Sequence, residues 1–142
     1  MKKTLLLTTF LALAGCCNKQ QMISCDAIVQ QYRPVVHFEH NQASLTAHDK
    51  HILQQVPGYI NHCPNIQVHI TGYTDNTGTA DYNKTLGLLR AQTAEMYLQE
   101  IGIHADRIHV VTKGEQDPIG NNTTEDGRKL NRRAVITFSQ KQ

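Results

Sequence analysis

Residues 66–78 read IQVHITGYTDNTG, and this stretch decides the fold. Its first five residues alternate apolar and polar side chains, which is the period of a strand with one buried face. Gly72 closes the predicted strand, and the polar run Thr74–Gly78 forms a loop behind it. The stretch therefore predicts a half-buried strand whose carboxyl end opens into a polar loop.

A long helix is predicted directly after this loop. From Thr79 onward, side chains of one face recur every three or four residues, which is the period of an amphipathic helix. Gly102 is a natural C-terminal stop for it. The positions that we expect to form the apolar face are Tyr82, Leu86, Leu89, Thr93, Tyr97 and Ile101.

The rest of the chain supplies three more strands and one more helix. Thr46 and Asp49 have capping-box spacing and open a helix through Ile52 and Val56, which Pro57 and Gly58 should end early or distort. The order strand, helix, strand, helix, strand, strand predicts an α+β fold, a two-layer sandwich with helices packed on one face of a mixed sheet. The additional strands are expected at 35–38, 108–111 and 134–138, with a polar loop before the last.

The first residues have the layout of an export signal. Lys2 and Lys3 precede an apolar run of about ten residues, which is well short of the roughly twenty that a transmembrane helix needs. The sequence LAGC that ends at Cys16 resembles the bacterial lipobox. By this resemblance residues 1–15 are a signal peptide, Cys16 is acylated, and the lipid anchors the mature chain. The alternative is an ordinary cleaved signal that leaves a soluble periplasmic protein.

The residue after the acylated cysteine bears on the membrane. In lipoproteins an aspartate there favours retention in the inner membrane, and this chain has Cys17 instead. The resemblance therefore implies the outer membrane, with the domain in the periplasm, and several acyl chains on one cysteine suit durable anchoring. Residues 16–24 are a polar, glutamine-rich tether, and residues 25–142 are the expected domain.

Size and charge limit the possible functions. The chain has 142 residues, enough for one domain with one main site. Without Lys2 and Lys3 the 14 basic residues fall to 12, which equals the number of acidic residues. A formally neutral mature chain has no bulk field that would favour nucleic acid.

Two of the four cysteines are candidates for a disulfide. Cys16 is assigned to the lipid, and Cys17 is free or acylated. Cys25 and Cys63 remain in an oxidising compartment, where a cross-link between them would contribute on the order of 4 kcal/mol in the chain-entropy model. The alternative is a pair of unpaired thiols.

A charged constellation surrounds the predicted loop. Asn83 and Arg90 are almost two turns apart, so their side chains leave the same helix face, which borders the apolar one. Arg90 can lay its aliphatic stem on apolar surface and keep its guanidinium free for a partner. Asp75, near the helix start, can either hydrogen-bond backbone N–H groups there or bind a ligand, and spacing alone does not decide between the two.

A family resemblance covers roughly residues 35–138. The motifs TDNTG (74–78), Tyr82-Asn83, Leu86, Arg90-Ala91, Gly114-Glu115, Pro118, Asn122, Gly127-Arg128 and Asn131-Arg132-Arg133 resemble the OmpA-like domain of Gram-negative envelope proteins. That family includes the peptidoglycan-associated lipoprotein. The resemblance implies the same sandwich fold and a domain that binds diaminopimelate in the stem peptide of peptidoglycan.

Roles for individual residues follow from the resemblance. Asp75 would bind the ammonium group of diaminopimelate and Arg90 its carboxylate, in a bidentate contact that a lysine would not reproduce. Neither Asp75→Ala nor Arg90→Ala is then expected to unfold the domain. Thr74 and Asn83 would add hydrogen bonds, and Leu86 would border the pocket. The remaining residues implied are an opposite wall of Phe38, Glu39 and His40, with Glu39 where the family has aspartate, and at most one of Arg132 and Arg133.

Other functions find little support. Eight histidines are many for this length, and His37 with His40, or His48 with His51, have metal-compatible spacing. No cysteine or carboxylate cluster completes either set, so we expect no metal or cofactor. The neighbours His62 and Cys63 lack the partners of a hydrolase site, so we expect no enzyme.

Two hypotheses remain open. In the first, the lipoprotein binds peptidoglycan non-covalently and anchors the membrane, or an envelope complex, to the wall. In the second, it acts mainly through protein partners in a trans-envelope or secretion assembly. An exposed apolar patch away from the cleft would favour the second hypothesis.

Overall fold

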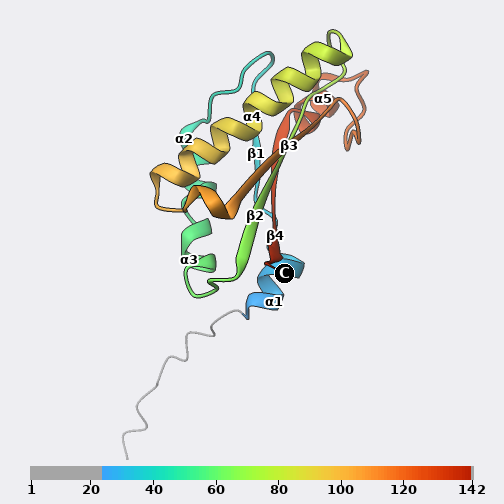
Figure 1. Ribbon diagram of the computed structural model, residues 1–142. Coiled ribbons are helices and arrows are strands. Elements are labelled where there is room, and N and C mark those ends of the chain that lie inside the picture. The colour runs from blue at the N-terminus through green and yellow to red at the C-terminus, as the bar shows by residue number, and fades with distance from the viewer. Residues whose placement is uncertain (1–23, 142) are drawn as a thin grey trace, which may run out of the picture.

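The computed structural model describes residues 24–141 and arranges them around one sheet (Figure 1). The signal peptide, Cys16, Cys17 and nearly all of the predicted tether lie outside the described residues. The elements are α1 (Cys25–Gln31), β1 (Val35–His37), α2 (Ala47–Leu53), α3 (Val56–Ile60), β2 (Ile66–Tyr73), α4 (Ala80–Glu100), a 3₁₀ turn η1 (Ala105–Arg107), β3 (Ile108–Gly114), α5 (Glu125–Asn131) and β4 (Arg133–Gln140).

The sheet is mixed, with the strand order β1-β4-β2-β3. Strand β2 is interior: it pairs in parallel with β3 and antiparallel with β4. Strand β1 pairs antiparallel with β4 at the other edge. The stretch that decides the fold therefore lies at the centre of the sheet, paired on both sides.

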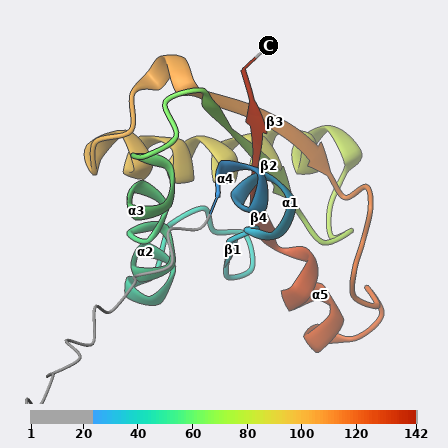
Figure 2. The same ribbon diagram turned by 90° about the horizontal axis from the view of Figure 1, so that it is seen from below.

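The main helices cover one face of this sheet (Figure 2). Val68 and Ile70 of β2 and Ile136 of β4 are fully buried, in one core with Ala94 and Leu98 of α4. The alternate positions of β2 and β3 point to the other face, where the strands are partly exposed. The predicted α+β sandwich with helices on one face is thus confirmed.

The buried face of α4 is not the predicted one. Tyr82 and Leu89, expected in the apolar face, are 47% and 48% exposed. The buried residues of the helix are Asn83, Gly87, Arg90, Ala91, Ala94 and Leu98. Small side chains let this face approach the sheet closely, and closeness outweighs the apolar area that the other face could bury.

Two short helices were missed in the sequence. Helix α1 buries only Ile28, so it has no apolar period to detect. Helix α5 is a charged segment that contains Gly127, and we read it as part of a loop. Its start is fixed locally, because the Thr124 side chain accepts a hydrogen bond from the backbone of Gly127.

The predicted break at Pro57 is present. Helix α2 opens with the expected capping box of Thr46 and Asp49 and ends at Leu53. Helix α3 then begins at Val56 with the proline in its first turn, where its missing N–H costs nothing. Asp49 also accepts a hydrogen bond from the backbone of His37, which ties α2 to β1.

The predicted disulfide is also present. Cys25 of α1 is bonded to Cys63, which lies between α3 and β2, with Cα atoms 5.8 Å apart. Tyr32 packs beside it, stacked on Phe138 of β4 and against Tyr59 of α3. Within residues 24–141, no helix has both the length and the apolar character to span a membrane.

Candidate functional site

The site lies where β2 ends. Thr74 and Asp75 follow the strand directly, and both are buried, with 3% and 4% of their surface exposed. The backbone N–H of Thr74 donates to the carbonyl of Gly114, at the end of the parallel neighbour β3. The loop then runs to Thr79, whose side chain caps α4. Asp75 is therefore held at the edge of the sheet, and Thr79, not Asp75, caps the helix.

The Asp75 carboxylate has partners on both oxygens. Oδ1 accepts the backbone N–H of Thr77 at 2.9 Å, and Oδ2 accepts the guanidinium of Arg132 at 3.1 Å. Burial alone would raise the pKa of Asp75, but the bonds from Thr77 and Arg132 outweigh it and hold that pKa below its ordinary value. The group is consequently a charged carboxylate at neutral pH.

Arg90 is fully buried, and its guanidinium is not free as predicted. It donates to the backbone carbonyls of Gln42 at 2.8 Å, Tyr73 at 2.9 Å and Glu39 at 3.2 Å. The guanidinium carbon lies 5.2 Å from the centre of the Phe38 ring. Burial lowers the pKa of Arg90 to about 10, with Asp75 acting in the opposite direction, so the side chain remains charged at neutral pH.

Arg132 and Arg133 differ as the strand geometry predicts. Arg132 is buried and joins three groups: Asp75, Glu125 at 2.9 Å and the carbonyl of Phe38 at 3.1 Å. Arg133 contacts neither carboxylate; it donates to the carbonyl of Asp117 and lies 3.8 Å over the ring of Tyr73. Adjacent strand residues point to opposite faces, so only Arg132 meets the residues around Asp75.

Two buried polar atoms at the site lack a partner among the described residues. They are the hydroxyl oxygen of Thr74 and the side-chain carbonyl oxygen of Asn83. The amide nitrogen of Asn83 is used: it donates to Glu115 at 2.6 Å. Buried polar atoms are nearly always paired in folded proteins, so two unpaired ones beside Asp75 indicate acceptors available to a ligand.

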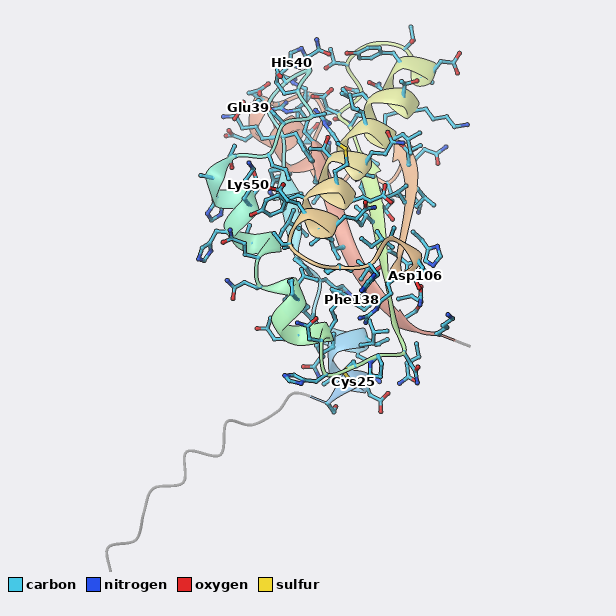
Figure 3. All side chains as sticks on the ribbon, turned by 60° about the vertical axis from the view of Figure 1, so that its left-hand side comes forward. Cys25, Glu39, His40, Lys50, Asp106 and Phe138 are labelled. Atoms are coloured by element: carbon cyan, nitrogen blue, oxygen red, sulfur yellow. A yellow bond between two sulfur atoms is a disulfide. The ribbon has the colours of Figure 1, made fainter. Side chains whose placement is uncertain are left out.

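The opposite wall contributes mainly through its backbone. The carbonyls of Phe38 and Glu39 accept Arg132 and Arg90, while the Glu39 side chain is exposed. His40 turns its imidazole toward Asp75, with Nδ1 4.0 Å from Oδ2 (Figure 3). Leu86 is half-buried. The departure from the family aspartate at Glu39 thus changes a side chain that makes no contact with Arg90 or Asp75.

Sequence reasoning missed the partners of the predicted residues. The contact of Glu115 with Asn83 could have been suspected from the Gly114-Glu115 motif, and the contact of Glu125 with Arg132 had no such signal. The structure describes no group of three or more histidine, cysteine or acidic residues arranged to hold a metal ion within residues 24–141. His69 and His109 stack on the open face of the sheet, each bonded to a neutral neighbour.

Comparison with known proteins gives consistent matches. Residues 37–132 match the OmpA family. The peptidoglycan-binding protein ArfA of Mycobacterium tuberculosis is 40% identical over 102 residues, which are 72% of this chain and 31% of ArfA. The peptidoglycan-associated lipoprotein of Haemophilus influenzae is 33% identical over 112 residues, 79% of this chain and 73% of that protein.

A solved structure gives the same result. The peptidoglycan-associated lipoprotein from Burkholderia pseudomallei superposes with a TM-score of 0.72 at 28% identity, over 75% of this chain and 90% of that one. The chain thus spans only about a third of ArfA but most of the two lipoproteins.

Proposed function

Because this chain belongs to the OmpA family, we propose that its folded part binds peptidoglycan non-covalently. The family consists of non-enzymatic binding domains, so the chain is not an enzyme. The observation that carries the proposal is the set of unsatisfied groups around one carboxylate, namely the buried unpaired oxygens of Thr74 and Asn83 beside the charged Asp75.

The proposed ligand is the diaminopimelate residue of the stem peptide. It carries an ammonium and a carboxylate on one carbon, so its recognition needs an acid and a base close together. Asp75 would accept the ammonium, and the Asn83 carbonyl oxygen offers a second acceptor for N–H groups. A guanidinium has five N–H donors, of which Arg90 uses three on backbone carbonyls. Its remaining N–H groups and the Thr74 hydroxyl would serve the carboxylate.

Co-sedimentation with purified peptidoglycan tests this function. Residues 18–142 carry the whole described fold, and we expect them to sediment with diaminopimelate-type wall. Removing one partner of a desolvated charge contact typically costs about 2–5 kcal/mol, so Asp75→Ala should remain in solution. Asp81→Ala is the matched control, because Asp81 is an exposed acid of the same helix end.

The choice of wall makes the test sharper. Lysine-type peptidoglycan lacks the side-chain carboxylate, so the wild type should bind it more weakly than the diaminopimelate type. Equal binding to both walls would contradict diaminopimelate as the ligand. Failure to bind either wall, with the far-ultraviolet circular dichroism intact, would contradict peptidoglycan binding itself.

We further propose that the chain is an outer-membrane lipoprotein anchored through Cys16, with its domain in the periplasm. The lipobox-like LAGC sequence and the two lipoprotein relatives support this location. Metabolic labelling with a radioactive fatty acid should modify the wild-type chain and leave Cys16→Ala unlabelled. Label that persists in Cys16→Ala would assign the lipid to another residue.

One observation favours a second function, assembly with a protein partner. Leu89 and Met96 of α4, seven residues apart, are 48% and 60% exposed on the outer face of the helix. Exposed apolar side chains at helical spacing are typical of a protein contact. A photo-crosslinker placed at Met96 in cells would form a protein adduct if this face is an interface, and peptidoglycan binding alone predicts none.

A further inference from the structure

A β-turn at Glu39–Gln42 is fastened firmly to α4. The backbone N–H of its last residue donates to the carbonyl of its first at 3.1 Å, and Asn41 has the left-handed φ of 55° that asparagine tolerates well. Arg90 binds the carbonyls at both ends of this turn, and the hydroxyl of Tyr82 donates to the Asn41 side chain. The turn is therefore positioned by the helix, and His40 lies at its tip.

The imidazole of His40 lies on the open side of Asp75. Its Nδ1 is 4.0 Å from Oδ2, and its side chain is 63% exposed, whereas that of Asp75 is 5% exposed. Arg132 and the backbone of Thr77 already hold the carboxylate from within the fold. A ligand's ammonium must therefore approach the carboxylate from the side that His40 borders (Figure 3).

We propose that His40 regulates this site: in its protonated form it pairs with Asp75 and competes with the ammonium group of the ligand, so the chain binds peptidoglycan more weakly in acid. The proposal rests on the proposed function, because it concerns the same carboxylate. It adds a residue whose charge changes with pH to a site whose other charges are fixed.

The fixed charges can be identified one by one. Hydrogen bonds hold the pKa of Asp75 below its ordinary value, so this carboxylate stays ionised from pH 5 to 8. Burial lowers the pKa of Arg90 only to about 10, so it stays protonated. The amine and carboxylates of diaminopimelate also keep their charges in this range. Histidine is the side chain whose ordinary titration lies there, so acid acts on His40.

Other charged groups face His40 but do not change this sign. From the remaining elements they are Arg132 at the start of β4, Glu125 of α5 behind it, Arg90 and the phenol of Tyr82 on α4, and Glu39 in the same turn. Arg132 is paired with both Asp75 and Glu125, which neutralises its effect on the imidazole. Asp75 is the carboxylate that forms an ion pair with His40 among residues 24–141.

The test measures affinity against pH. The probe is a soluble stem tripeptide that ends in meso-diaminopimelate, titrated into residues 18–142 at pH 5.5, 6.5 and 7.5. An exposed ion pair contributes up to about 1 kcal/mol, so the wild-type Kd should rise by about threefold to fivefold from pH 7.5 to 5.5. His40→Asn, which keeps a polar side chain without titration, should change less than about twofold.

Two histidine variants are matched controls. His104→Asn removes an exposed histidine beyond the far end of α4, and His37→Asn removes one that faces Asp49 and Arg133. Both should keep the wild-type pH dependence. A second readout needs no ligand: in NMR titrations the midpoint of His40 should fall in Asp75→Asn, because the neighbouring negative charge is gone.

The outcomes separate this proposal from the proposed function. Binding that is independent of pH, or that weakens equally in His40→Asn, would overturn the proposal and leave peptidoglycan binding intact. Binding that strengthens in acid would overturn it as well, since protonated His40 would then attract the ligand's carboxylate. No binding at any pH would overturn the proposed function and this proposal together.

Discussion

Arg90 is the residue whose expected role changes most between the sequence and the structure. From the sequence we expected a free guanidinium and a variant that folds. The buried guanidinium instead satisfies the carbonyls of Glu39, Gln42 and Tyr73. It joins the turn, the end of β2 and α4, so it organises the site before any ligand arrives.

Removal of this side chain should therefore destabilise the fold. Arg90→Ala leaves three carbonyls without donors, and breaking such a buried charged contact typically costs about 3–5 kcal/mol. Urea unfolding measures the loss, and Lys84→Ala, an exposed cation of the same helix, should lie within about 0.5 kcal/mol of wild type. If Arg90→Ala proves as stable as Lys84→Ala, water satisfies these carbonyls and the guanidinium is free to serve the ligand alone.

The Asp75 carboxyl gives stability a defined dependence on pH. Its pKa in the folded chain is lowered by Thr77 and Arg132 against the effect of burial. A lowered pKa means that the folded state favours the ionised form, so the contribution is complete above the ordinary value of about 3.9 and disappears as pH falls through the lowered one.

Urea unfolding between pH 5 and pH 2.5 measures this contribution. Wild type should lose more stability over that range than Asp75→Asn, whose side chain does not titrate. Asp81→Asn should follow the wild-type curve. Parallel curves for wild type and Asp75→Asn would show that Arg132 does not hold the carboxylate in solution.

At the scale of elements, the contact between α4 and β2 depends on two glycines. A Cβ at Gly72 would lie 1.8 Å from the carbonyl oxygen of Gly87. One at Gly87 would meet the Thr112 hydroxyl at 2.4 Å, at the end of a side chain that can rotate. The backbones of strand and helix therefore touch at this point, which explains why the helix turns this face inward.

Alanine substitutions should reveal that contact. Gly72→Ala must push the helix from the sheet and should cost about 3 kcal/mol or more, because overpacking against backbone cannot be relieved by a rotamer change. Gly87→Ala should cost less, since it also gains about 1 kcal/mol of helix propensity. Gly58→Ala has no atom within 4 Å and serves as the control. Thermal unfolding ranks the three, and equal melting temperatures would contradict the close contact.

The elements show what sequence patterns can and cannot predict. The alternation in residues 66–70 and the caps at Thr46 and Thr79 are local signals, and the structure has these elements where they were predicted. The buried face of α4 was wrong because periodicity reports apolar area, whereas this face is chosen by close approach at Gly87. Helices α1 and α5 were missed because each is seven residues long and neither has an apolar repeat.

The site was predictable to a similar extent. A family motif identifies Asp75, Asn83 and Arg90, and strand alternation separates Arg132 from Arg133. The acceptors of Arg90 are backbone carbonyls, which every residue carries, so only the folded chain can show which ones are used. The contact between His40 and Asp75 likewise depends on a turn 35 residues earlier in the chain than the carboxylate, at the tertiary contact that an ion pair records.

At the scale of the whole molecule, the Cys25–Cys63 disulfide closes a separation of 38 residues. The chain-entropy model gives such a cross-link about 4 kcal/mol. Reduction, or Cys25→Ser with Cys63→Ser, should lower the free energy of unfolding by about that amount in urea, with the reduced wild type matching the double variant. A reduced chain that is as stable as the oxidised one would mean that the unfolded ensemble is compact without the bond.

The disulfide also decides how the proposed anchor would carry tension. A pull between the membrane and the wall would enter the fold near Cys25 and leave it at Asp75, at opposite ends of the molecule (Figure 3). The bond passes the load covalently to Cys63, three residues before β2, and β2 runs through the centre of the sheet to Asp75. Helix α1, strand β1 and the turn that carries His40 are thereby bypassed. The chain would act as a tie rod, with the ligand pocket at the end of its strongest strand and outside the stretch that force deforms first.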